Sequence, residues 1–226
     1  MSTPTSELEQ IAPERPKPRL RGVSHFYAFF VAVALGVGAI VSAPNGTATF
    51  AATVYAVGMA CMFGASALYH RPHWSVAAAA RALQLDHSAI FVMIAGTVTP
   101  IALLAVEPPM RVVVLALVWG VAIGGIVFEW LPVHRPRGYS TAVYLALGWA
   151  GVLGIGGLWE STGPLGVGLV AIGGLLYTIG AVVHAARRPD PWPEVFGYHE
   201  IFHAFVIAAA LAHYVAITFL VLPLGD

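Results

Sequence analysis

Charged residues are scarce in this chain. Asp, Glu, Lys and Arg make up 10% of the 226 residues, whereas hydrophobic residues make up 58%. A soluble domain usually carries about 25% charged residues and less than half apolar ones. So few charges cannot cover a folded chain with a water-facing surface. The composition therefore excludes an ordinary soluble protein and indicates a chain that is buried in lipid.

Basic tracts and paired cysteines are missing as well. The formal net charge is zero and no run of Lys or Arg interrupts the hydrophobic part, so we expect no nucleic-acid partner. The single cysteine, Cys61, excludes an intramolecular disulfide framework. Because it lies in an apolar run, we expect it to be a small buried packing residue.

Seven apolar stretches reach the length of about 20 residues that a helix needs to cross a bilayer. Polar residues or Pro and Gly separate them, as at turns. The expected spans are 25–43, 49–70, 82–106, 111–131, 139–159, 164–186 and 198–222. The sequence thus predicts an all-α fold, a polytopic bundle of seven transmembrane helices formed by residues 22–226. The polar, proline-rich residues 1–21 lack the apolar core of a signal peptide and are predicted to be a disordered cytoplasmic tail.

The basic residues predict the orientation of the bundle. Ten of the eleven Lys and Arg residues fall in the N-terminal tail and in the loops at 71–81, 135–137 and 187–188, which all lie on one side. On the other side there is only Arg111. Because Lys and Arg gather on the cytoplasmic side of membrane proteins, we expect the N-terminus inside and the C-terminus outside.

Four ionisable residues lie at the edges of the predicted spans. An Asp or Arg at the centre of a span costs about 2.5–3.5 kcal/mol on insertion scales, so such residues usually mark function. His70 ends the second span, Asp86 lies about one turn into the third, and His199 and His203 open the seventh. The predicted topology places all four at the cytoplasmic ends of their helices. They therefore share one membrane depth, which predicts a single cluster.

The spacing within this cluster is typical of a metal site. His199 and His203 are four residues apart, so both project from one helical face and can bind one metal. His70 is the candidate third ligand, which leaves a fourth position for water as in catalytic zinc sites. Three nitrogen ligands favour Zn²⁺, although Fe²⁺ and Ni²⁺ stay open. The alternative is that these histidines only contact headgroups and water at the membrane interface.

Two further residues have candidate catalytic roles. Asp86 is placed to act as a general base or to hold a water molecule by a hydrogen bond. Ser66, one turn from His70 on the same face, could donate to a developing oxyanion or could simply pack between helices. Glu129 and Glu200 are expected to be solvated carboxylates at helix ends. His213, about 21 Å along the helix from His199, is too far to share its metal and is expected to hydrogen-bond between helices.

Three motifs carry a resemblance to a known family: 66–70 (SALYH), 85–100 (LDHSAIF followed by AGTVTP) and 196–203 (FGYHEIFH). In this order and spacing they resemble the bacterial hemolysin III family. That family is similar to the progestin and adiponectin receptors and, more distantly, to the alkaline ceramidases. The resemblance covers about residues 22–222. It implies a seven-helix fold with a cytoplasmic N-terminus and a zinc ion held by His70, His199 and His203, with Asp86 and Ser66 matching the acidic residue and the serine near the metal.

These observations leave three hypotheses about function. The first is a zinc-dependent hydrolase of the cell membrane that cleaves an amide or ester bond of a membrane lipid. The second is a membrane-homeostasis or sensor protein in which zinc is structural. The third is a cytolysin or pore, which is disfavoured because the outer halves of the spans carry few ionisable groups. Neither the substrate nor the oligomeric state follows from the sequence.

Overall fold

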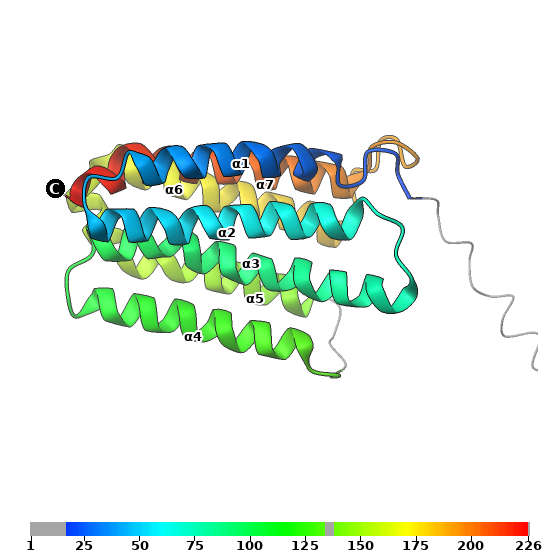
Figure 1. Ribbon diagram of the computed structural model, residues 1–226, viewed down its shortest axis with the longest axis horizontal. Helices are drawn as coiled ribbons and strands as arrows, with labels where there is room; N and C mark the ends of the chain where they lie inside the picture. The colour runs from blue at the N-terminus through cyan, green and yellow to red at the C-terminus, as the bar shows by residue number, and fades with distance from the viewer. Residues whose placement is uncertain (1–16, 134–137, 226) are drawn as a thin grey trace, which may run out of the picture.

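The computed structural model describes residues 17–133 and 138–225, and within these ranges the chain is helical with no extended strand. Figure 1 shows the helices lying side by side along one long axis, which confirms the predicted all-α bundle. The elements are α1 (Val23–Val41), α2 (Gly46–His70), α3 (Val76–Ala105), α4 (Met110–Trp130), α5 (Tyr139–Ala150), a 3₁₀ turn (Gly151–Gly154), α6 (Ile155–Ala186), α7 (Tyr198–Ala216), a π-helical turn (Ile217–Val221) and a final 3₁₀ turn (Leu222–Gly225).

Side-chain caps fix where two of the central helices begin. The Asn45 side chain accepts a hydrogen bond of 3.0 Å from the backbone N–H of Ala48, and Ser75 caps the start of α3 in the same way. Such caps satisfy backbone donors that the first helical turn leaves without an intrahelical partner. The loops 42–45 and 71–75 between these helices are short, and α1, α2 and α3 pack as consecutive neighbours.

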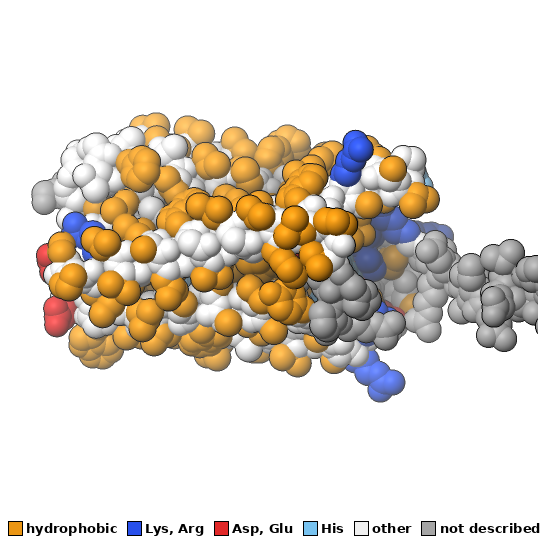
Figure 2. Space-filling view, turned by 90° about the horizontal axis from the view of Figure 1, so that it is seen from below, with side chains coloured by type: hydrophobic (Ala, Val, Ile, Leu, Met, Phe, Trp, Pro, Cys, Tyr) orange, Lys and Arg blue, Asp and Glu red, His pale blue; other side chains and the backbone are white. Residues whose placement is uncertain are grey.

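The outer surface of the bundle is apolar. Large hydrophobic side chains are exposed on every α-helix and on the π-helical turn, among them Val41, Phe50, Ile123 and Phe219. Figure 2 shows hydrophobic side chains spread over the length of the molecule, with charged side chains gathered at its two ends. Such a surface fits a lipid environment. Cys61 belongs to it: the expectation of a buried packing residue is wrong, because an apolar run in a membrane helix also supplies the face that meets lipid.

Six stretches of the described chain are long and apolar enough to cross a membrane, where the sequence predicted seven. The difference lies in Tyr139–Ala186, which is one stretch of 48 residues. A straight helix of that length would measure about 72 Å, more than twice the ~30 Å of the hydrocarbon core. The chain breaks at Gly163, whose φ of 65° and ψ of −162° are not helical.

The stretch doubles back at this break. The indole N–H of Trp149 donates to the hydroxyl of Thr178 over 3.2 Å, although 29 residues separate the two in sequence. A straight helix would hold these residues about 44 Å apart. A single non-helical glycine thus stands where the sequence predicted a loop. Because no loop separates the expected spans 139–159 and 164–186, they count as one apolar stretch.

The residues before α1 lie along the loop between α6 and α7. We call residues 17–22 the N-terminal strap. The backbone N–H groups of Arg19 and Leu20 donate to the carbonyls of Glu194 and Val195 over 3.0 and 3.1 Å. Figure 1 shows the strap and this loop at the end of the bundle where α3 and α7 begin. Of the predicted tail, residues 1–16 lie outside the described residues, whereas 17–21 make these contacts.

Candidate metal centre

Three histidines from two helices converge at this end of the bundle. His70 is the last residue of α2, and His199 and His203 lie in the first two turns of α7. One donor nitrogen of each lies within 4.8 Å of those of the other two. Nε2 of His199 and Nε2 of His70 are 3.0 Å apart. His70 and His203 are buried and His199 is half-buried, so the cluster is largely shielded from bulk water.

The arrangement fits a tetrahedral metal ion. Two imidazole nitrogens that bind one zinc ion at about 2.0–2.1 Å are separated by roughly 3.3 Å when the geometry is tetrahedral. The observed 3.0 Å between the His70 and His199 nitrogens is close to this value. Moreover, Nδ1 of His203 is buried with no hydrogen-bond partner among the described residues. Buried polar atoms normally have a partner, and a bound cation or a hydrogen-bond acceptor beyond the protein would provide one.

Asp86 and Ser66 lie beside the three histidines. Oδ2 of Asp86, from the third turn of α3, is 3.9 Å from Nε2 of His70. Ser66 lies one turn before His70 in α2, on the same face, and is buried. The structure thus brings together all five residues that the sequence singled out. A carboxylate next to a cluster of imidazoles can accept a proton or balance the charge of a bound cation.

A fourth histidine completes the cluster, and the sequence reasoning missed it. His25, in the first turn of α1, is 2% exposed and its Nδ1 lies 2.8 Å from Oγ of Ser66. Its ring stacks on that of His203, with ring centroids 3.6 Å apart and planes 6° from parallel. A signal was available: α1 starts on the same predicted side as α3 and α7, so the depth argument that selected Asp86 and His199 applies equally to His25.

Glu200 also differs from the expectation. It was expected in solvent, but its side chain is 3% exposed. Nε of Arg21 in the strap donates to Oε1 over 2.6 Å, and Oε2 accepts the backbone N–H of Gly197 over 2.8 Å. Glu200 lies between His199 and His203 in the sequence. Its hydrogen bonds connect the strap to the first turn of α7. The sequence could not reveal this contact because Arg21 is 179 residues away.

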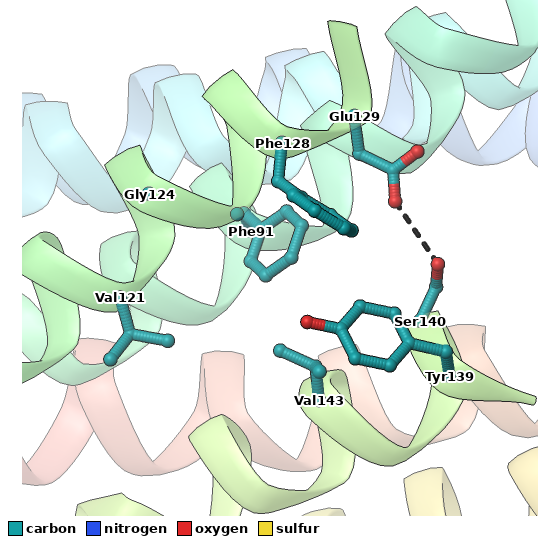
Figure 3. Close-up of a pocket in the computed structure, with 9 residues that line it drawn as sticks. Phe91, Val121, Gly124, Phe128, Glu129, Tyr139, Ser140 and Val143 are labelled. Carbon is teal, nitrogen blue, oxygen red and sulfur yellow. Dashed lines mark hydrogen bonds between the residues drawn. The ribbon is translucent and has the colours of Figure 1, made fainter. Parts of the chain in front are cut away.

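Glu129 is buried too, in a second polar cluster between α3, α4 and α5. Its carboxylate accepts the Ser140 hydroxyl over 3.0 Å and lies 3.4 Å from Nδ1 of His87. Figure 3 shows this carboxylate at the edge of a cavity of about 290 Å³ whose walls include Phe91 and Phe128. The expectation of a solvated Glu129 is wrong because α5 folds over the end of α4. His213 follows the expectation of an interhelical hydrogen bond, with Nε2 3.1 Å from the Val170 carbonyl of α6.

Comparison with known proteins shows the family. The profile of the haemolysin-III-related family matches residues 14–214. The chain is 35% identical over 205 residues to "Hemolysin-3" of Bacillus cereus, covering 85% of this chain and 90% of that protein. It is 36% identical over 135 residues to "Hemolysin-3 homolog" of Bacillus subtilis, covering 60% and 61% of the two chains.

A plant protein is also similar. "Heptahelical transmembrane protein ADIPOR2" of Oryza sativa is 34% identical over 151 residues, covering 59% of this chain and 65% of that one. With six apolar stretches long enough to cross a membrane and a family match over most of its length, the chain is a multi-pass protein of the cell membrane and belongs to the haemolysin-III-related family.

Proposed function

We propose that the protein is a zinc-dependent hydrolase that cleaves an amide or ester bond of a membrane lipid. One observation carries the proposal: the Asp86 carboxylate lies 3.9 Å from a nitrogen of the buried three-histidine cluster, inside an apolar bundle. In a site that only cross-links two helices, a carboxylate at that distance orients a ligand or balances charge. In metallohydrolases, by contrast, a carboxylate beside the metal serves as general base.

Each residue of the site has a defined task in this proposal. His70, His199 and His203 hold the ion, which when bound supplies a Lewis acid and lowers the pKa of water to about 7. Asp86 accepts a proton from the attacking water and passes it to the leaving group. A lipid reaches the site between helices, since the outside of the bundle is apolar over its length.

The proposal includes the topology. We propose that Tyr139–Ala186 crosses the membrane twice, so that the bundle has seven spans with a cytoplasmic N-terminus. The turn at Gly163 and the hydrogen bond between Trp149 and Thr178 support two crossings. The distribution of Lys and Arg in the sequence supports the orientation. The metal site then lies near the cytoplasmic face.

Labelling of single cysteines tests the topology. In a Cys61→Ser background, cysteines introduced at Ser161 and at Arg188 would be offered a membrane-impermeant thiol reagent on intact cells. We expect labelling at position 161 and none at position 188 until the membrane is opened. Equal labelling of both positions from outside would contradict the double crossing.

Lipid hydrolysis by the purified protein tests the activity. The detergent-solubilised protein would be incubated with ceramides, N-acylethanolamines and phospholipids, and the released fatty acid measured. We expect release that is lost in His203→Ala and in Asp86→Asn and is unchanged in Cys61→Ser, a substitution on the outer surface. If the His203→Ala variant released fatty acid as fast as the wild type, the protein would not be a metal-dependent hydrolase.

A membrane-homeostasis or sensor protein with structural zinc is the second candidate. It is favoured by the fact that the ligands join the end of α2 to the start of α7, as a structural cross-link would. In that case a chelator lowers thermal stability, and Asp86→Asn has little effect on any function of the protein. A cytolysin is a third candidate, since the Bacillus cereus relative is called "Hemolysin-3". It predicts lysis of erythrocytes by the purified protein even when His203 is replaced.

A further inference from the structure

The cavity beside Glu129 is formed by α3, α4 and α5, and none of its lining residues has a task in the proposed hydrolysis. Its volume is about 290 Å³. Pockets for small ligands usually span about 300–1,000 Å³. The cavity is therefore large enough for one chain or a small group, but too small for a phospholipid with its headgroup and two chains.

The cavity opens on the apolar outer surface of the bundle. Two of its lining residues, Val121 and Tyr139, are 41% and 43% exposed. At its inner wall, Phe91 and Glu129 are each only 2% exposed. A molecule dissolved in the bilayer can therefore enter between α4 and α5 and reach a buried carboxylate.

The polarity of the cavity changes along its length. Figure 3 shows Val121 at one end and Glu129, hydrogen-bonded to Ser140, at the other. Glu129 is the second-last residue of α4 and so lies near a boundary of the bilayer, whereas Val121 lies about 12 Å along the helix toward the membrane centre. A chain aligned with the surrounding lipids would place its polar head at Glu129 and its apolar tail at Val121.

The polar end favours a cationic head. Oε1 of Glu129 accepts the Ser140 hydroxyl over 3.0 Å, and Oε2 lies 3.4 Å from Nδ1 of His87. A carboxylate has about four lone-pair sites, so it can accept from a ligand as well. Inside an apolar bundle, an ammonium group is attracted to this carboxylate and the carboxylate head of a fatty acid is repelled.

Aromatic rings line the cavity next to this carboxylate. The rings of Phe128 in α4 and Tyr139 in α5 have centroids 5.5 Å apart, and Phe91 of α3 forms the inner wall. Figure 3 shows the three rings in the space between Val121 and Glu129. The faces of aromatic rings attract ammonium groups, most strongly where water is excluded. The rings and the carboxylate thus favour the same kind of head.

We propose that this cavity binds a single-chain amphiphile with a protonated amine head. The ammonium group lies at Glu129, and the tail lies along α4 toward Val121. The site is separate from the metal centre, so the inference does not depend on hydrolysis.

Binding of dodecylamine tests the site. The purified protein in phosphatidylcholine nanodiscs would be titrated with tritium-labelled dodecylamine, with empty nanodiscs as background. We expect one saturable site per chain. Dodecanol and dodecanoate carry the same chain with a hydroxyl or a carboxylate head. They should compete at least about 10-fold more weakly than unlabelled dodecylamine, because only the amine brings a positive charge to the buried carboxylate.

Two substitutions test the head and the tail separately. Glu129→Gln keeps an oxygen for the Ser140 hydroxyl but removes the charge. It should weaken dodecylamine binding about 10–100-fold, the loss of a hydrogen bond to a charged group, so that dodecylamine and dodecanol bind alike. A Cβ at Gly124, which lines the cavity, meets no atom of the described residues within 4 Å. Gly124→Leu should therefore fill the cavity and abolish binding. Gly38→Leu is the matched control, since Gly38 in α1 has the same open space outside the cavity, and it should bind as the wild type does.

Several results would overturn the proposal. They are the absence of saturable binding, equal affinity for the three heads, and unchanged dodecylamine affinity in Glu129→Gln or in Gly124→Leu. Because an amine can also bind zinc, the titration would be repeated with a chelator. Unchanged binding is expected, whereas binding lost on chelation would place the amine at the metal centre and overturn the proposal. A protein that binds dodecylamine but releases no fatty acid would lose the proposed function and keep this site.

Discussion

Gly22, the last residue of the strap, is a position where one methyl group should disturb the metal site without touching a ligand atom. It precedes α1 with φ 73° and ψ 0°, in the left-handed region. A Cβ built on Gly22 would lie 2.5 Å from Cβ of His70. We therefore expect Gly22→Ala to act in two ways, through backbone strain and through displacement of His70.

The two effects have different magnitudes and different readouts. A non-glycine residue in the left-handed region costs about 1–2 kcal/mol, which lowers the stability of the fold. Relieving the contact requires His70 to move by about 1 Å, since carbon atoms at optimal separation are about 3.5–4.0 Å apart. Metal–ligand distances tolerate only about 0.2 Å. We therefore expect Zn²⁺ affinity to fall at least about 10-fold, a loss comparable to that from disturbing the surroundings of a ligand.

Gly138→Ala is the matched control. Gly138 also precedes a helix, α5, and has nearly the same backbone conformation, with φ 81° and ψ −4°. A Cβ there meets no atom of the described residues within 4 Å. Thermal unfolding with and without chelator, together with the Zn²⁺ competition assay, would be run on both variants. We expect both variants to lose a similar amount of stability and Gly22→Ala alone to lose Zn²⁺ affinity. Equal Zn²⁺ affinities in the two variants would refute the reasoning.

Other contacts give further expectations. Glu200→Gln replaces the charged partner of Arg21 and should lower the stability of the strap contact by about 1.5–3 kcal/mol, toward the low end because Arg21 is partly exposed. Hydrogen exchange of the strap amides should become faster. Unchanged exchange would contradict the contact between the strap and α7. Gly173→Ala places a methyl group against the His213 ring and should lower the free energy of unfolding by about 1–3 kcal/mol. Gly168→Ala, in the same helix with open space around it, should not destabilise. Zn²⁺ at 1,000 times its dissociation constant should stabilise the wild type by about 4 kcal/mol, which comparison of unfolding with and without chelator would measure.

The sequence predicted which residues lie together because membrane topology restricts where a helix end can lie. His70 ends one span while His199 opens another, and both ends face the same side, so their depth follows from the chain alone. The i, i+4 spacing of His199 and His203 then fixes a shared face. Depth and face together were enough to select His70, Asp86 and the two α7 histidines.

Neither signal identifies which helices are neighbours. His25 has the same depth as Asp86, but only packing of α1 against α2 and α7 places its ring on His203. The partner of Glu200 is likewise invisible, because Arg21 belongs to a strap that only the fold brings to α7. The number of spans depended on Gly163, where a single residue reverses the chain without leaving a loop.

The metal content of the detergent-purified protein tests the central claim most directly. His70, His199 and His203 should hold about one zinc ion per chain in the wild type. His199→Ala removes the nitrogen that lies 3.0 Å from that of His70, so this variant should be purified nearly free of metal while remaining folded by circular dichroism. A metal-free wild type, or a His199→Ala variant with as much zinc as the wild type, would contradict the account.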